Sequence, residues 1–579
     1  MSSNAKKRAA QKSAGSKTAV KTVVSETKRS MVEYVVVNII CLFAFLSFGY
    51  IALMSFFQTS VIDPNAYSSE KILFQPDMIP LNILCLALFG GFLFAIRKKY
   101  DFFAKVNLQI AEIAVAVLVV ILGLIWVTSV KSIPGADSAN LFEAATGAAN
   151  GNYTAMQDGT NFYNHAFYSN YNYFNFYPFQ LGFVAFSELI YRIFGTDSSM
   201  PIQVLNVLCL GGTYFALARI TKLLFKRKSI EFIAILMLAG CLQPVLFCTF
   251  AYGNIIGMCC AIWASLFLIK YFQTTAYKWL APCGVLLVLA VFVKYNNMIY
   301  LAAFVIMLLV HTFKAKKWQS VAFALAVCVA TFGSNALVVI HYENRAETEF
   351  ADGISQVLYL DLGMQESYMA PGWYTSIAKD LYIQSQLDSE LANERAWNNI
   401  SYRAEAFSDI DYTLDFYSKK ILSQWNEPTF ESIWVSKVKQ HTVDDELSVS
   451  GTKTVSSEEL KGLGEAVYDN SLGQLLELHF GFYMQVIYIL FAAGIYLLFI
   501  NRKTNIETVL FPLVLMGGFG YHLLFEGKSQ YILTYIPLLI PTAAYAMNVI
   551  VFGKYEKLKK LIDKINVIPN RFNGKPTQN

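Results

Sequence analysis

The sequence predicts an all-α polytopic membrane protein with about 12–13 transmembrane helices and a mostly helical external domain. Its 579 residues are 55% hydrophobic and only 15% charged, whereas a soluble protein carries about 25% charged residues. Apolar runs of about 20 residues recur along the chain, and each is long enough to cross the roughly 30 Å hydrocarbon core of a bilayer. These observations exclude a soluble enzyme or binding module.

The apolar runs define a series of expected spans and one ambiguous segment. The segment 178–195 is apolar, but it begins with Pro178 and contains Glu188 and Arg192. We therefore expect it to be either a juxtamembrane or re-entrant helix, or a full span. The expected spans lie near residues 33–57, 78–97, 109–130, 202–221, 230–250, 253–272, 278–294, 297–313, 319–341, 478–500, 507–525 and 530–552.

Clusters of lysine and arginine between the runs predict which span ends face the cytoplasm, because cytoplasmic loops carry an excess of these residues. If 178–195 does not cross, all the clusters come out on the cytoplasmic side, and we prefer this topology. If 178–195 does cross, the sidedness of everything after it inverts. The clusters are RKKYDFFAK, KLLFKRKS, KYFQTTAYK, KAKK, NRKTN and KYEKLKK.

Composition divides the chain into five parts. Residues 342–475 hold about twice as many acids as bases, with apolar residues at helical spacing, which predicts a helical external domain. All nine cysteines lie in apolar runs, as is typical of small core hydrophobes. The parts are a disordered basic cytoplasmic tail (1–30), a transmembrane module (31–341) with an external loop (131–177), the external domain (342–475), C-terminal transmembrane helices (476–552) and a basic cytoplasmic tail (553–579).

Asp137 stands a few residues after an apolar run, in the stretch KSIPGADSANLFEAATGAA. Pro134 and Gly135 end the preceding helix, and the small residues that follow predict a short amphipathic helix. A carboxylate at a water–lipid boundary can act as a catalytic base. It can also cap the following helix, since Asp is a favoured N-cap residue. The two roles are compatible.

Aromatic and amide residues alternate densely in NFYNHAFYSNYNYFNFYPFQLGF, residues 161–183, which includes His165 and Tyr177. Such a segment is typical of an interfacial aromatic belt. It also fits a loop that contacts sugar or lipid, where ring faces stack and amides bond to hydroxyls. The sequence leaves both interpretations open.

Two lysines lie close to apolar runs. Lys294, in LAVFVKYNNMIYLAAF, is costly in the membrane unless it snorkels to the interface or meets an anion. Lys528 lies in a tight turn with His522 and Glu526, where it could simply form a solvated Glu–Lys pair. In the preferred topology these residues share one membrane face with Asp137. An acid, two bases and many aromatics at one face suit a substrate with a phosphate at headgroup level and a tail in lipid, because lysines hold phosphate as point charges.

The chain resembles the GT-C superfamily of membrane glycosyltransferases, which includes protein O-mannosyltransferases and aminoarabinose transferases. It is most similar to the glycosyltransferase family 39-like membrane proteins of Gram-positive bacteria. The resemblance covers about residues 109–552 and rests on Asp137, on YNYFNFYPFQLGFVAF, on Lys294 in VKYNN, and on GKSQYILTYIPLLIP, which resembles the family pattern KSRY-x-x-P-Y.

The resemblance implies a role for each matching residue. Asp137 corresponds to the catalytic base, and Lys294 and Lys528 correspond to contacts of the donor phosphate. The expected sugar and acceptor contacts are Glu526, Tyr531, His165, Tyr177, Asn254 and Gln530.

The sequence departs from the family pattern at three places. Asp137 is followed by Ser138 where related mannosyltransferases have Glu, Gln530 replaces the usual Arg, and Asn254 stands where some relatives have a second external Asp. With one clear carboxylate we expect no metal cofactor, although a divalent cation remains possible, because such cations favour oxygen-rich sites.

The function we expect is transfer of a sugar from an undecaprenyl-phosphate donor to a cell-wall glycopolymer, glycolipid or protein. The site would lie on the extracellular face of the plasma membrane, in contact with membrane lipid. No nucleic-acid partner is expected, because the basic tail lacks a folded or aromatic context. One alternative is a lipid-linked sugar transporter or flippase, although transporters tend to place charges near the bilayer midplane. Another is an envelope-assembly or sensor protein whose external domain binds a partner.

Overall fold

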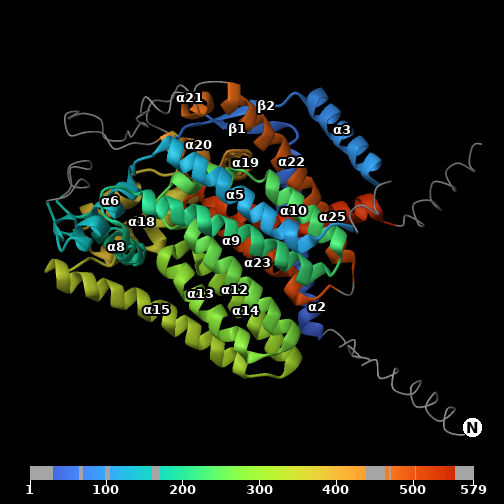
Figure 1. Ribbon diagram of the computed structural model, residues 1–579. Coiled ribbons are helices and arrows are strands. Elements are labelled where there is room, and N and C mark those ends of the chain that lie inside the picture. The colour runs from blue at the N-terminus through green and yellow to red at the C-terminus, as the bar shows by residue number, and fades with distance from the viewer. Residues whose placement is uncertain are drawn as a thin grey trace, which may run out of the picture.

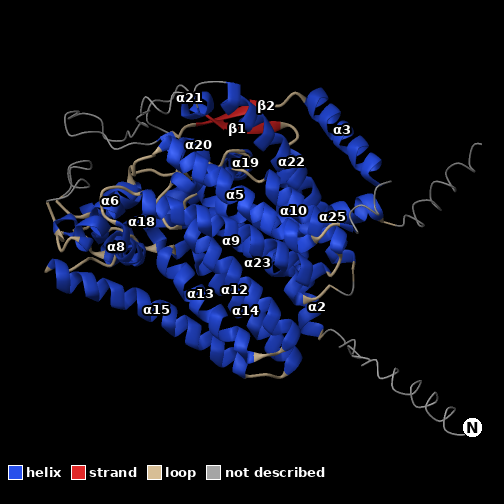
Figure 2. Cartoon of the chain, in the orientation of Figure 1, coloured by secondary structure: helices blue, strands red, loops and turns tan. Residues whose placement is uncertain are grey.

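The computed structural model describes residues 30–63, 70–97, 105–159, 170–437, 463–468, 471–501 and 504–553. In this part of the chain nearly every regular element is a helix (Figures 1 and 2). The described strands are β1 (Gln58–Ile62) and β2 (Ile72–Pro76), which pair as an antiparallel hairpin. The predicted all-α fold is confirmed.

Ten helical segments of the described chain are long and apolar enough to cross a membrane, so the predicted polytopic architecture is also confirmed. The helices of these segments are α2 (Met31–Met54), α3 (Ile79–Arg97), α5 (Leu108–Val130), α9 (Met200–Phe225), α12 (Asn254–Thr274), α14 (Met298–Ala315), α15 (Gln319–Ala346), α22 (Ser471–Ile500), α23 (Leu510–Leu524) and α25 (Ile536–Phe552).

Two of the expected spans differ from single straight helices. The run near 230–250 forms α10 (Lys228–Gly240) and a second piece, Gln243–Thr249, which bend by 45° at their junction. Pro244 stands in the first turn of the second piece, where its ring and missing N–H break the continuity of the helix. The run near 278–294 forms α13 (Leu280–Val293), which is apolar but short.

The ambiguous segment 178–195 forms α8 (Leu181–Phe194), whose 14 residues extend only about 21 Å. This is shorter than the hydrocarbon core. Arg192 near its end donates to the Ala148 carbonyl at 3.1 Å, and Gly182 near its start faces the Phe292 backbone. α8 therefore contacts α6 near its end and the last turn of α13 near its start.

Some basic residues near described helix ends pair with buried carboxylates. Glu33, fully buried in the first turn of α2, accepts from Lys314 at 3.0 Å and from the backbone N–H of Ile506 at 3.1 Å. Glu112 in α5 likewise pairs with Arg219 at 2.8 Å. Buried carboxylates thus draw together helix ends that adjoin basic loops far apart in the sequence.

The described part of residues 342–475, the segment expected to form an external domain, packs onto this framework through short helices. Side chains of Asp388 and Asp409 accept backbone N–H groups at the starts of two of them, as N-cap residues do. Leu358 and Ala392 of the domain share one apolar core with Tyr252 of the membrane module, so domain and bundle form a continuous structure. The helices are α16 (Gln356–Gly363), α17 (Ile377–Gln384), α18 (Ser389–Ala406), α19 (Ile410–Trp425), α20 (Ser432–Lys437) and α21 (Leu463–Tyr468).

We predict that Glu33→Gln lowers the free energy of unfolding by about 2 kcal/mol, because a charge-assisted hydrogen bond to Lys314 is lost at a buried site. Thermal unfolding of the detergent-purified protein measures this as a lower Tm. Glu405→Gln, at an exposed position on α18, is the control and should leave Tm unchanged. Equal Tm values for both variants would contradict the role given to Glu33.

Candidate functional site

Asp137 is the first residue of α6 (Asp137–Ala149), but it does not cap this helix. The N-cap position belongs to Ala136, whose φ of +49° turns the chain sharply into the helix. Ser138 secures the turn instead, by donating its hydroxyl to the Gly135 carbonyl at 2.8 Å. The expectation that Asp137 caps the helix is therefore wrong, and its side chain is available for other contacts.

Asp137 joins a polar chain that links three separate segments. Its Oδ2 accepts the Tyr252 hydroxyl at 3.0 Å. Tyr252 in turn accepts the Gln180 amide N–H at 2.5 Å. The Lys294 ammonium stands 3.7 Å from the centre of the Tyr252 ring, where cation–π attraction holds it. Gly253 permits this approach, because a Cβ there would lie 2.3 Å from the Val293 carbonyl oxygen.

The electrostatics of the site suit a base beside a cation. Burial among protein atoms raises the pKa of Asp137, while the hydrogen bond from Tyr252 and the charge of Lys294 oppose this shift. By surface area, however, Asp137 is exposed, so solvent reaches its carboxylate and weakens the rise of its pKa. Lys294 is only 8% exposed, and burial lowers its pKa to about 7 against the opposing charges of Asp137 and Glu526.

The turn between α23 and α24 (Ser529–Ile532) brings Glu526 to the same place. Tyr531 donates to Glu526 Oε1 at 3.2 Å, and His522 Nδ1 donates to the Glu526 carbonyl at 3.0 Å. Burial raises the pKa of Glu526 to about 7, and the charge of Asp137 adds to that shift while Lys528 opposes it. The two carboxylates are thus close enough to influence each other.

Lys528 forms ion pairs with two carboxylates. Its ammonium pairs with Glu70 at 2.8 Å and with Glu431 at 3.2 Å. Ser529 donates to the same Glu431 at 2.9 Å, and these acids together raise the pKa of Lys528 despite its burial. Lys528 lies near enough to lower the pKa of Asp137, but most of its charge is balanced within the protein. Lys294, which rests on an aromatic ring, is better placed to meet an incoming anion.

The remaining expected residues have different surroundings. Tyr177 packs its ring 4.8 Å from that of Tyr173, in an aromatic cluster. Asn254 is buried in the first turn of α12, and its Oδ1 has no hydrogen-bond partner in the described part of the protein. Gln530 reaches the site through its backbone N–H, which donates to Glu431 at 3.2 Å. His165 lies outside the described residues.

The structure adds residues that the sequence analysis did not single out. Tyr252 and Gln180 complete the contacts of Asp137; the glycine after Tyr252 was the signal that could have pointed to this turn. Two buried lysines come from the external domain, Lys379 on α17 and Lys420 on α19. Lys379 is near enough to lower the pKa of Asp137. No local pattern marks either lysine, because their partners lie far away in the sequence.

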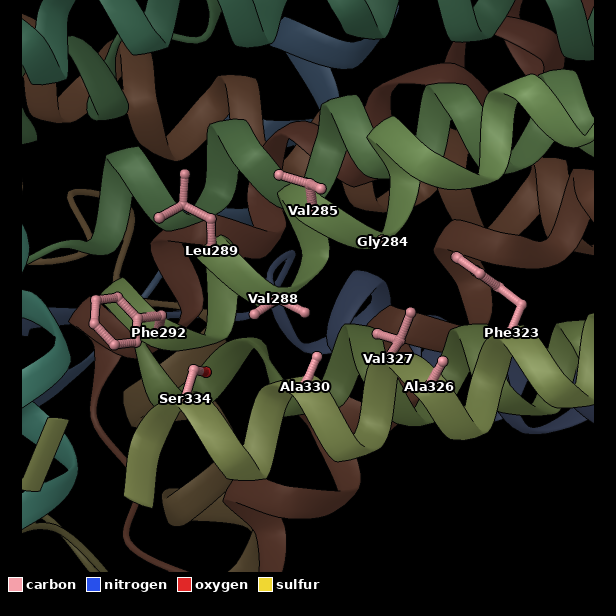
Figure 3. Close-up of a pocket in the computed structure, with 10 residues that line it drawn as sticks. All are labelled: Gly284, Val285, Val288, Leu289, Phe292, Phe323, Ala326, Val327, Ala330 and Ser334. Atoms are coloured by element: carbon pink, nitrogen blue, oxygen red, sulfur yellow. The ribbon is translucent and has the colours of Figure 1, made fainter. Parts of the chain in front are cut away.

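An open apolar groove of about 500 Å³ lies between α13 and α15 (Figure 3). Side chains of both helices face each other across it, and Phe292 at one end is two residues before Lys294. The groove thus runs along α13, whose last residue, Val293, directly precedes Lys294. The lining residues are Gly284, Val285, Val288, Leu289, Phe292, Phe323, Ala326, Val327, Ala330 and Ser334.

Metal ligands do not gather among the described residues, where no group of three or more His, Cys, Asp or Glu could hold a metal ion. The chemistry that the described groups themselves offer is acid–base and ionic. Asp137 can accept a proton, and Lys294 can hold an anion beside it.

Fold and site define a polytopic membrane protein with a polar centre at one end of its helical bundle and an apolar groove between α13 and α15. A family model described as "Dolichyl-phosphate-mannose-protein mannosyltransferase" matches residues 181–335. This stretch holds Tyr252, Lys294 and the whole groove. The match confirms the resemblance to GT-C membrane glycosyltransferases that the sequence predicts. No curated protein sequence matches the chain.

Two solved structures from Archaeoglobus fulgidus are similar in part. One is the oligosaccharyltransferase in its apo form, at 14% identity and a TM-score of 0.40, covering 80% of this chain and 53% of that one. The other is the oligosaccharyltransferase AglB with an inhibitory peptide and a dolichol-phosphate, at 14% identity and a TM-score of 0.36, covering 80% and 52%. The chain therefore spans about half the length of the solved structures it matches.

We predict that Tyr252→Phe raises the pKa of Asp137, because the lost hydroxyl donor stabilises the ionised carboxylate. Carbodiimide labels protonated carboxyls, so mass spectrometry of the Asp137 peptide should show labelling that persists to higher pH than in wild type. Tyr300→Phe is the control, since the buried Tyr300 hydroxyl has no hydrogen-bond partner among the described residues. An unchanged labelling curve in Tyr252→Phe would contradict the prediction.

Proposed function

We propose that this protein is a membrane glycosyltransferase that moves a sugar from a polyprenyl-phosphate donor to an acceptor outside the cytoplasm. The observation that carries this proposal is that Asp137 and Lys294 both contact Tyr252, one at its hydroxyl and the other at its ring, while an apolar groove runs along α13, the helix that ends just before Lys294. The family match over residues 181–335 supports it.

Sugar transfer needs a base and a place for the leaving phosphate. Asp137 takes the proton of the acceptor hydroxyl as the acceptor oxygen forms its bond to the anomeric carbon. The bond from that carbon to the phosphate oxygen breaks, and its electron pair stays on the phosphate. Burial raises the pKa of Asp137, which makes it a stronger base than an ordinary aspartate. Attack from the face opposite to the phosphate inverts the anomeric configuration.

Lys294 stabilises the negative charge that grows on the departing phosphate. Its lowered pKa reflects a charge that burial leaves poorly compensated, and a phosphate arriving beside it restores that compensation. Lys528 holds the turn that carries Glu526, and it contributes at longer range. Glu526 accepts hydrogen bonds from hydroxyls of the transferred sugar, with Tyr531 as its neighbour.

The donor's polyprenyl chain occupies the groove between α13 and α15. The groove is lined almost entirely by apolar side chains, apart from Ser334. Neighbouring residues on the outer face of α15, such as Val329 and Leu337, are highly exposed, as expected for a surface in contact with lipid. A chain in this groove would place its phosphate at Lys294.

The biological setting follows from the resemblance to family 39-like proteins of Gram-positive bacteria. The donor would be an undecaprenyl-phosphate sugar, and the acceptor a cell-wall glycopolymer, glycolipid or protein. The site would face the extracellular side of the plasma membrane.

Mass spectrometry of the envelope sugars tests this function. A deletion strain is complemented with wild type, Asp137→Asn or Glu143→Gln at matched protein levels. Asn keeps the shape of Asp137 but cannot take a proton, so transfer should fall roughly 10²- to 10⁴-fold. One sugar should disappear in both the deletion and the Asn strain. Glu143, an exposed acid later on α6, is the matched control and should support normal levels.

A flippase would give a different result. If the deletion strain loses a sugar while Asp137→Asn retains it at the wild-type level, Asp137 is not a catalytic base. The protein would then move the lipid-linked sugar without transferring it. If the deletion changes no envelope sugar, the glycosyltransferase proposal itself fails.

We predict that Ala330→Trp raises the KM for undecaprenyl-phosphate sugars by roughly 10-fold, because the indole fills the groove and removes binding energy from the chain. A short-chain donor analogue should be much less affected. Val329→Trp is the control, since Val329 lies next to Ala330 but points to the outside of α15, where it is 73% exposed. Equal KM values for both tryptophan variants would contradict this chain path.

A further inference from the structure

The turn that carries Glu526 is held mainly by the external domain. Lys420 of α19 donates its ammonium to the Phe525 carbonyl at 2.9 Å. Gln424, one turn later, donates to the His522 carbonyl at 3.3 Å. The backbone N–H of Gly527 donates to the Gly372 carbonyl at 2.9 Å. These three contacts bracket Glu526 on both sides.

Lys420 is the charged residue among the three that contact this turn. It has no exposed surface, and its ammonium donates to the Gly363 carbonyl as well as to the Phe525 carbonyl. A buried ammonium that meets only neutral carbonyls is expensive. Burial lowers its pKa to about 7, and the nearby charge of Glu526 opposes that shift.

Two glycines allow the external domain to close around Lys420. A Cβ at Gly372, where φ is +71°, would lie 2.5 Å from Lys420 Cε and 2.7 Å from its Nζ. A Cβ at Gly363 would lie 2.3 Å from the Leu524 carbonyl oxygen. Larger residues at either position would separate the domain from the turn. The fit is therefore specific to this lysine and this turn.

Lys420 also acts on Glu526 through its charge. Burial is the main cause that raises the pKa of Glu526, to about 7, and Lys420 is one of the charges that lower it. Loss of the ammonium would raise the pKa of Glu526 further, and a smaller fraction of Glu526 would be ionised near neutral pH.

We propose that Lys420 is a positioning residue of the site: its ammonium ties the Phe525 carbonyl to the external domain and so fixes the backbone that presents Glu526 to the sugar. The external domain then helps to form the site and does not only cover it. This inference rests on the proposed function for the part played by Glu526, but the contact itself is independent of it.

The test compares Lys420→Met with Lys419→Met. Lys419 is the adjacent residue, partly exposed and paired with Asp415 at 2.7 Å, so its loss removes the same charge without touching the turn. Membrane vesicles from the deletion strain that carry each variant are assayed with radiolabelled undecaprenyl-phosphate sugars across a pH series. Hydrogen exchange of the peptide covering residues 521–530 is measured on the purified full chain.

Lys420→Met should slow transfer roughly 10- to 100-fold, because small displacements of a substrate contact are costly. The acid limb of its pH–rate profile should move to higher pH, since Glu526 must be ionised to accept hydrogen bonds from the sugar. The 521–530 peptide should exchange faster. Lys419→Met should match wild type in all three measurements. A Lys420→Met profile that matches Lys419→Met overturns the proposal, and so does a loss of rate with an unmoved acid limb and unchanged exchange.

Gly372→Ala serves as a second variant if Lys420→Met does not fold. The added Cβ pushes the Lys420 ammonium away from the Phe525 carbonyl, but the lysine keeps its positive charge. The transfer rate should therefore fall, while the acid limb of the pH–rate profile moves little. Gly151→Ala is its control, because Gly151 also has a positive φ, +77°, and a Cβ there meets nothing within 4 Å. If wild type transfers no sugar from any donor, the proposed function fails, and hydrogen exchange alone decides whether Lys420 positions the turn. Normal rates and exchange in Gly372→Ala would overturn the proposal.

Discussion

The hydrogen bond between Tyr252 and Asp137 is the contact on which the site depends. It joins the start of α6 to the turn before α12, and through the Tyr252 ring it reaches Lys294 at the end of α13. A carboxylate and a cation thereby contact one aromatic side chain. Without this bridge, Asp137 would be a carboxylate at a helix start with no fixed relation to the groove.

The rest of the bundle keeps this arrangement in one place. Buried carboxylates such as Glu33 and Glu112 pair with basic residues near helix ends, so the helices are held relative to one another. The external domain closes the site from the other direction, where Lys420 holds the turn that carries Glu526. The membrane helices and the external domain therefore contribute different residues to the same site.

Apolar runs were sufficient to predict most of the membrane helices, although the run near 230–250 bends and α13 is short. The same reasoning assigned Asp137 a capping role that Ala136 holds instead, because a left-handed residue before a helix leaves no pattern in side-chain polarity. It also could not foresee that Glu70 and Glu431 neutralise Lys528. Such pairings join residues far apart in the sequence, and they depend on the folded chain rather than on local sequence.

The central claim is that the donor's phosphate binds at Lys294 with its polyprenyl chain in the groove. Photo-crosslinking with a polyprenyl phosphate that carries a diazirine next to its phosphate tests this most directly. The account predicts labelled peptides around Lys294 and along the α13–α15 groove, with labelling competed by unlabelled polyprenyl phosphate and lost in Lys294→Met. Labelling confined to exposed faces of α2 or α3, or unchanged in Lys294→Met, would contradict it.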